Sequence, residues 1–122
     1  MKSTAIASLV ILALLSPTSS FAADPLTLEV ASAQRGHDLN NQIVLDVRLS
    51  DNSRRLFASW TGRHVNKTVH VLIDGRVVST PRLVGEITGG VLEVIGPSRD
   101  EINAWIGKLT DGRSVLSVES ED

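Results

Sequence analysis

The run VHVLIDGRVV, residues 69–78, predicts a tight β-hairpin. Apolar side chains alternate along residues 68–73, so one face of this segment suits a strand that packs on a core. Asp74 and Gly75 follow at once, and an Asp-Gly pair between two β-rich runs favours positive φ at both turn positions. Pro81 cannot donate a hydrogen bond to a sheet, so it ends the second arm or leaves that arm at a sheet edge.

Three further strands are predicted from short segments rich in apolar residues. They cover residues 43–49, 91–95 and 114–118. The first of these, IVLDVRL, has the clearest alternation, with a buried face and a face that carries Asp46 and Arg48. The strands are short and separated by turns, which is typical of antiparallel pairing.

Two helices are predicted between these strands. Residues 51–62 follow the capping residue Ser50, and the second helix begins after Ser98, which forms a capping box with Glu101. Each helix carries one apolar stripe, made of Leu56, Phe57 and Trp60 in the first and of Ile102, Trp105, Ile106 and Leu109 in the second. The predicted fold is therefore α+β, a two-layer sandwich in which two helices cover one face of a largely antiparallel sheet.

The start of the chain has the composition of an export signal. Lys2 supplies a positive charge, and residues 5–15 form an apolar segment that is too short to span a bilayer comfortably. We expect cleavage after Ala22, because a cut after Ala23 would place the bulky Phe21 where a small side chain is needed. The alternative is an uncleaved membrane anchor.

The predicted organisation has four parts. Residues 1–22 are the signal peptide, 23–42 a lead-in strand and polar loop, 43–118 the α+β domain, and 119–122 a frayed acidic tail. No second apolar stretch approaches the roughly 18 residues that a membrane helix needs, so no membrane span is expected after processing.

Composition excludes several classes of function. Removing Lys2 from the 12 basic residues leaves 11 against 14 acidic ones, a net charge of −3, and the arginines are scattered, so nucleic acid is not an expected partner. The chain has no cysteine, and His37, His64 and His70 lack the spacing of a metal site. No GxSxG motif or phosphate-binding loop occurs. We therefore expect no enzyme activity, no catalytic residues, no metal and no cofactor.

Several short blocks, in order, resemble a known family. They are LFASWTG at 56–62, VLIDGRV at 71–77, STP at 79–81, EITGG at 86–90 and IG at 95–96, followed by a helix that begins near Arg99. This order is similar to the head part of the first large periplasmic domain of SecD, the bacterial protein-export accessory subunit. The sequence departs from that family because it has no residue between Ile95 and Gly96, where the family has Thr or Ser.

The resemblance implies a periplasmic protein that handles secreted polypeptide. It implies the head's fold and binding surface only, because the transmembrane helices and intramembrane acidic residues that carry proton-driven work are not found in this sequence. We expect the polypeptide-binding surface at Pro81, Val84, Ile87, Gly89 and Gly90, where an extended chain can add to an incompletely paired edge. The residues expected to have a structural role in turns are Asp74, Gly75 and Gly96.

Two hypotheses for function remain open from the sequence. The first is an exported, non-enzymatic binding module that contacts unfolded secretory polypeptide or an envelope protein. The second is a periplasmic structural or regulatory protein, such as an inhibitor, that keeps only the fold. A contiguous exposed apolar patch or an open strand edge would favour the first.

Overall fold

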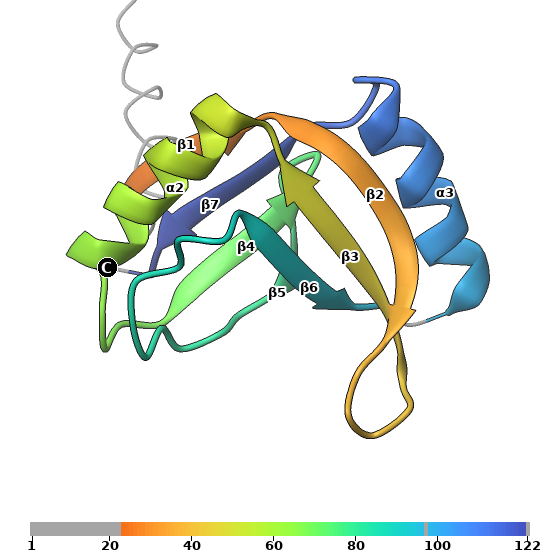
Figure 1. Cartoon of the computed structure of the whole chain (residues 1–122), viewed down its shortest axis with the longest axis horizontal. Helices are drawn as coiled ribbons and strands as arrows, with labels where there is room; N and C mark the ends of the chain where they lie inside the picture. The colour runs from red at the N-terminus through yellow and green to blue at the C-terminus, as the bar shows by residue number, and fades with distance from the viewer. Residues whose placement is uncertain (1–22, 97, 122) are drawn as a thin grey trace, which may run out of the picture.

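The computed structural model describes residues 23–96 and 98–121, and Figure 1 shows their arrangement. In chain order the elements are β1 (Ala23–Leu28), β2 (Val30–His37), β3 (Ile43–Leu49), α2 (Asp51–Arg63), β4 (Val69–Ile73), β5 (Arg76–Ser79), β6 (Val91–Ile95), α3 (Arg99–Thr110) and β7 (Leu116–Ser120). The predicted α+β class, with antiparallel strands and two helices, is confirmed.

The strands divide between two sheets. The first sheet has the order β1-β7-β4-β5 and the second has the order β2-β3-β6, and every pairing is antiparallel. The chain passes from one sheet to the other at Glu29, between β1 and β2. The Glu29 amide donates to Ser53 Oγ at 2.8 Å and the Glu29 carbonyl accepts from the Ser50 amide at 3.0 Å. These bonds hold the crossing point against the start of α2.

The segment predicted as one lead-in strand and a polar loop forms two strands, so residues 23–42 contain both β1 and β2. Sequence reasoning missed β2 because VASAQRGH has few large apolar residues and lies at the edge of its sheet. Only a short loop remains, in which Asp38 Oδ1 accepts hydrogen bonds from the amides of Asn40 and Gln42.

The hairpin forms where the sequence predicts it. Ile73 pairs with Arg76, which leaves Asp74 and Gly75 as the two turn residues, with φ of 54° and 81°. Both angles lie in the left-handed region that an Asp-Gly turn favours. The second arm, β5, is an edge strand of the first sheet, as the position of Pro81 suggested.

The prediction of a frayed tail after residue 118 is wrong for Glu119 and Ser120. Both belong to β7, which lies between β1 and β4, and Glu119 pairs with His70. The His70 ring nitrogens lie 3.6 Å from Glu119 Oε2 and 3.7 Å from Glu121 Oε2. This cross-strand contact explains how acidic residues are accommodated in the sheet.

Both helices contribute to one core. Phe57 and Trp60 of α2 and Ile102 and Leu109 of α3 are buried in the same cluster as the inward-facing strand residues. Trp105 and Ile106 are half-buried and pack against it. The expectation that Leu56 lies in the core is wrong, because 46% of this residue is exposed.

The N-terminal strand is fastened to the end of α2. Trp60 Nε1 donates to the Asp24 carbonyl at 2.8 Å, and His64 Nε2 lies 3.2 Å from Asp24 Oδ2. His64 is buried, and its Nδ1 lies 2.7 Å from the Trp60 carbonyl. Trp60 is thus a packing residue, as expected, and it also anchors the strand next to it.

Both predicted serine caps are present, but among the described residues no reciprocal bond to the Glu101 carboxylate completes the predicted capping box. Ser50 Oγ accepts from the Ser53 amide at 3.2 Å, and Ser98 Oγ accepts from the Glu101 amide at 3.1 Å. The Glu101 carboxylate lies 3.8 Å from the guanidinium of Arg76, which links α3 to the hairpin. None of the described helices is long and apolar enough to cross a membrane.

Candidate polypeptide-binding site

The predicted binding residues lie in the connection between β5 and β6. After β5 ends at Ser79, the chain continues beside the residues that precede β4. The Pro81 carbonyl accepts from the Val69 amide at 2.9 Å, and the Leu83 amide donates to the Lys67 carbonyl at 2.9 Å. The backbone around Pro81 is therefore hydrogen-bonded to the start of β4, contrary to the incompletely paired edge that the sequence predicts. The open strand edge near this connection belongs to β6.

An apolar hollow of about 230 Å³ lies between this connection and β6. The connection supplies Pro81, Val84 and Ile87, β6 supplies Val91, Leu92 and Glu93, and core residues Phe57, Val69, Val71 and Val118 complete the lining. Since a cavity of about 150 Å³ holds a benzene molecule, this hollow has room for one large apolar side chain.

The outer edge of β6 borders the hollow. The Leu49 amide donates to the Gly90 carbonyl at 2.9 Å, and the register continues with Val47 opposite Leu92. Because antiparallel pairs alternate, the backbone groups of every second β6 residue point toward β3 and those of Val91, Glu93 and Ile95 point away from it. Among the described residues, β6 pairs with β3 and with no other strand, so its outer edge is open.

A buried threonine fixes the connection to α2. Thr61 Oγ1 donates to the Ala58 carbonyl at 3.1 Å and accepts from the Ile87 amide at 2.9 Å, and Thr61 has no exposed surface. Sequence reasoning missed this role because Thr61 and Ile87 are distant in the chain. The one sequence signal for this role is a threonine on the apolar side of a predicted helix, where a hydroxyl needs a hydrogen-bond partner.

The structure brings Pro81, Val84 and Ile87 together, but it gives them different environments. Val84 is 88% exposed at the rim, whereas Ile87 packs partly against the core. Gly89 is exposed, and Gly90, which directly precedes β6, has φ of 70° and lies beneath the side chain of Arg54. A substitution at Val84 should therefore change the rim of the hollow with little effect on the stability of the fold.

The three turn residues are away from the hollow. A Cβ on Gly96 would collide with Ile102 Cγ1, so this glycine allows α3 to pack closely. Asp74 Oδ1 accepts from the Val115 amide at 2.9 Å and Oδ2 from the Ser114 hydroxyl at 2.8 Å. The hydrogen bond from Val115, and then that from Ser114, lower the pKa of Asp74 below its ordinary value.

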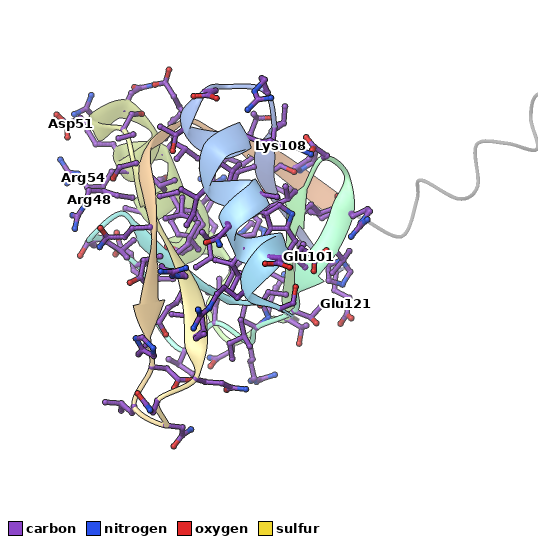
Figure 2. The ribbon with its side chains drawn as sticks, turned by 90° about the vertical axis from the view of Figure 1, so that its right-hand side faces the viewer. Arg48, Asp51, Arg54, Glu101, Lys108 and Glu121 are labelled. Carbon is purple, nitrogen blue, oxygen red and sulfur yellow. The ribbon has the colours of Figure 1, made fainter. Side chains whose placement is uncertain are left out.

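Arginine side chains lie near one end of the open edge of β6, and a glutamate lies in the middle of the strand. Arg48 and Arg54 project from the same side of the molecule, beside Asp51 (Figure 2), and Arg54 Nη2 lies 4.0 Å from Asp51 Oδ1. Glu93 lies further along β6, where it lines the hollow and is exposed. Within residues 23–96 and 98–121, no group of three or more His, Asp or Glu side chains is arranged to hold a metal ion.

A second hollow, of about 630 Å³, lies where β1 passes into β2. It mixes Leu56 and Val115 with polar side chains such as Asn52 and Asp111. Its apolar surface is therefore less continuous than that of the hollow beside β6.

Comparison with known proteins agrees with this architecture. The sequence model of the SecDF P1 head subdomain matches residues 26–104. The chain belongs to the SecDF P1 head family. Within this family, the "Protein translocase subunit SecD" of Acidaminococcus fermentans is 28% identical over 68 residues, which are 56% of this chain and 16% of that protein.

A solved structure also shares the P1 head fold. It is described as "Structure and function of a membrane component SecDF that enhances protein export", and it superimposes with a TM-score of 0.63 at 23% identity. The match covers 67% of this chain and 38% of the other. The chain thus corresponds to a limited part of these larger proteins, and the similarity to the solved structure concerns the fold.

Proposed function

We propose that the protein is an exported, non-enzymatic binding module that contacts secreted or unfolded polypeptide during protein export. The observation that carries the proposal is the apolar hollow between residues 81–87 and the open edge of β6. An edge strand offers backbone hydrogen bonds to any extended chain, and the hollow accepts an apolar side chain from it. Membership of the SecDF P1 head family supports a role in export.

The affinity should be modest. One hollow of about 230 Å³ and one short strand bury little surface, so we expect dissociation constants in the micromolar range or weaker. Weak and reversible contact suits a protein that must release each segment of a moving chain.

Crosslinking to an unfolded secretory protein tests the proposal. The wild-type protein should give crosslinks, and Val84→Asp should reduce them several-fold, since a carboxylate at the rim opposes entry of an apolar side chain. Val77→Asp is the matched control, because Val77 is 51% exposed on β5 and does not line the hollow. Crosslinks no more frequent than background for the wild type would leave the structural or regulatory alternative.

We also propose that the protein acts in the periplasm after cleavage behind Ala22. The start of β1 supports this position, because Ala23 pairs with Ser120 and Asp24 is held by Trp60 and His64. A cut after Ala22 leaves all these contacts in place. The intact mass of protein recovered from the periplasm should correspond to residues 23–122, and a mass that includes the first 22 residues would contradict it.

A further inference from the structure

A row of polar side chains crosses the outer face of the second sheet at its middle. The register places Gln34 of β2 opposite Asp46 of β3, and Asp46 opposite Glu93 of β6. Their neighbours Val47 and Val94 are core residues, so the side chains of this row point to the other face. Glu93 is the last member of the row and stands at the open edge.

The row ends in two adjacent carboxylates. Like charges directly opposite each other on neighbouring strands are unfavourable, and neither Asp46 nor Glu93 forms an ion pair with any of the described residues. The Asp46 carboxylate occupies the space above Gly36 of β2, where a Cβ would clash with it. The Asp46 carboxylate therefore lies toward β2. Glu93 forms no ion pair with the described residues, although Arg48 lines the same hollow on this outer face.

We infer that the polypeptide segments preferred at this edge carry a lysine or arginine between two apolar residues. The inference rests on the proposed function and specifies its substrate class. When an extended chain pairs with β6, the residue opposite Glu93 points outward and becomes the next member of the row. Its two neighbours in the chain point inward, where one can enter the apolar hollow. A basic side chain opposite Glu93 supplies the ion pair that Glu93 does not form with the described residues.

Nearby charges fix where the basic residue fits. Arg48 lies in the next row, opposite Val91, so a second basic residue two positions along the bound chain gains no such partner. On the other side, His37 and Asp38 line a shallow hollow together with Glu93. The carboxylates of Asp38, Asp46 and Glu93 therefore outnumber Arg48, the one arginine that lines these hollows.

Charge also argues against a second copy of this chain as the occupant. If two β6 edges paired antiparallel about Glu93, the two Glu93 carboxylates would face each other. Inward or edge charges of this kind are a common way in which edge strands avoid self-pairing. A basic polypeptide segment relieves the same repulsion.

Fluorescence anisotropy with three labelled peptides tests the inference. The peptides are extended, seven residues long and identical except at the centre, which reads Leu-Lys-Leu, Leu-Gln-Leu or Leu-Glu-Leu. At low salt the lysine peptide should bind the purified protein about fivefold more tightly than the glutamate peptide, with the glutamine peptide between them. The difference should shrink at about 0.5 M salt, because this charge pair is exposed.

Glu93→Gln should remove the preference among the three peptides, and Glu86→Gln should keep it. Glu86 is the matched control because it is also an exposed glutamate in the same part of the chain but lies over Gly62 of α2. Equal binding of all three peptides to the wild type would overturn the inference and leave polypeptide binding intact. Absence of binding by any peptide at millimolar concentration would overturn both.

Discussion

Asp74 shows how one side chain can stabilise a turn and join it to a distant segment. Its backbone lies in the left-handed region, with φ of 54°. Its carboxylate accepts hydrogen bonds from Ser114 and Val115, which precede β7. The hairpin is thus tied to the segment between α3 and β7 by the charged form of a single residue.

The lowered pKa of Asp74 predicts a defined pH dependence. The folded carboxyl has a lower pKa than the unfolded one, so its contribution to stability is complete above the unfolded pKa of about 3.9 and is lost as pH falls toward the folded pKa. Asp74→Asn tolerates the same φ but lacks the charge. It should be less stable at neutral pH, and its stability should fall less steeply below about pH 4.

Urea denaturation at a series of pH values measures this effect. Asp111→Asn is the control, because Asp111 is also exposed but lies beside Arg113 at 3.0 Å and does not touch the hairpin turn. Parallel profiles for the wild type and Asp74→Asn below about pH 4 would show that the two hydrogen bonds do not favour the charged form.

At the scale of elements, α2 positions the connection that borders the apolar hollow beside β6. Thr61 accepts the Ile87 amide with a hydroxyl that has no access to solvent. Thr61→Val keeps the shape of the side chain and removes the acceptor, so we expect a loss of about 1–3 kcal/mol in the free energy of unfolding. Thr61→Ser should lose less, since it keeps the hydroxyl.

Hydrogen exchange adds a local measurement to that prediction. The Ile87 amide should exchange faster in Thr61→Val than in the wild type, while the amides of β3 should change little. Equal stability and equal exchange in the valine and serine variants would mean that another contact holds the connection.

The elements also show what a sequence can predict. Strands 43–49, 68–73 and 91–95 were predicted from their short runs of large apolar residues, and both helices because their stripes and caps are local signals. β2 and the end of β7 were not, since their polar residues become strands only through pairing with distant partners. For the same reason, the sequence could place Pro81 and Val84 at an exposed edge. The positions of Thr61 and Glu93 could not be predicted, because each is set by a residue distant in the chain.

At the scale of the whole molecule, the first and last described strands are neighbours. β1 pairs only with β7 in the first sheet, and β7 joins it to β4 (Figure 1). The second sheet contains only strands that precede α3. The second sheet therefore draws only on residues 30–95, whereas the first sheet combines the hairpin β4–β5 with strands from both ends of the described chain.

This arrangement delays completion of the first sheet until the end of the chain has been synthesised. During synthesis the segment 116–120 leaves the ribosome after every other described strand, yet it must take the place between two strands made earlier. Until it arrives, β1 has no partner and β4 holds only its own hairpin. Closing such a distant pairing is intrinsically slow. For a protein proposed to cross a membrane unfolded, this order favours export before folding, because the strand that completes the first sheet is synthesised last.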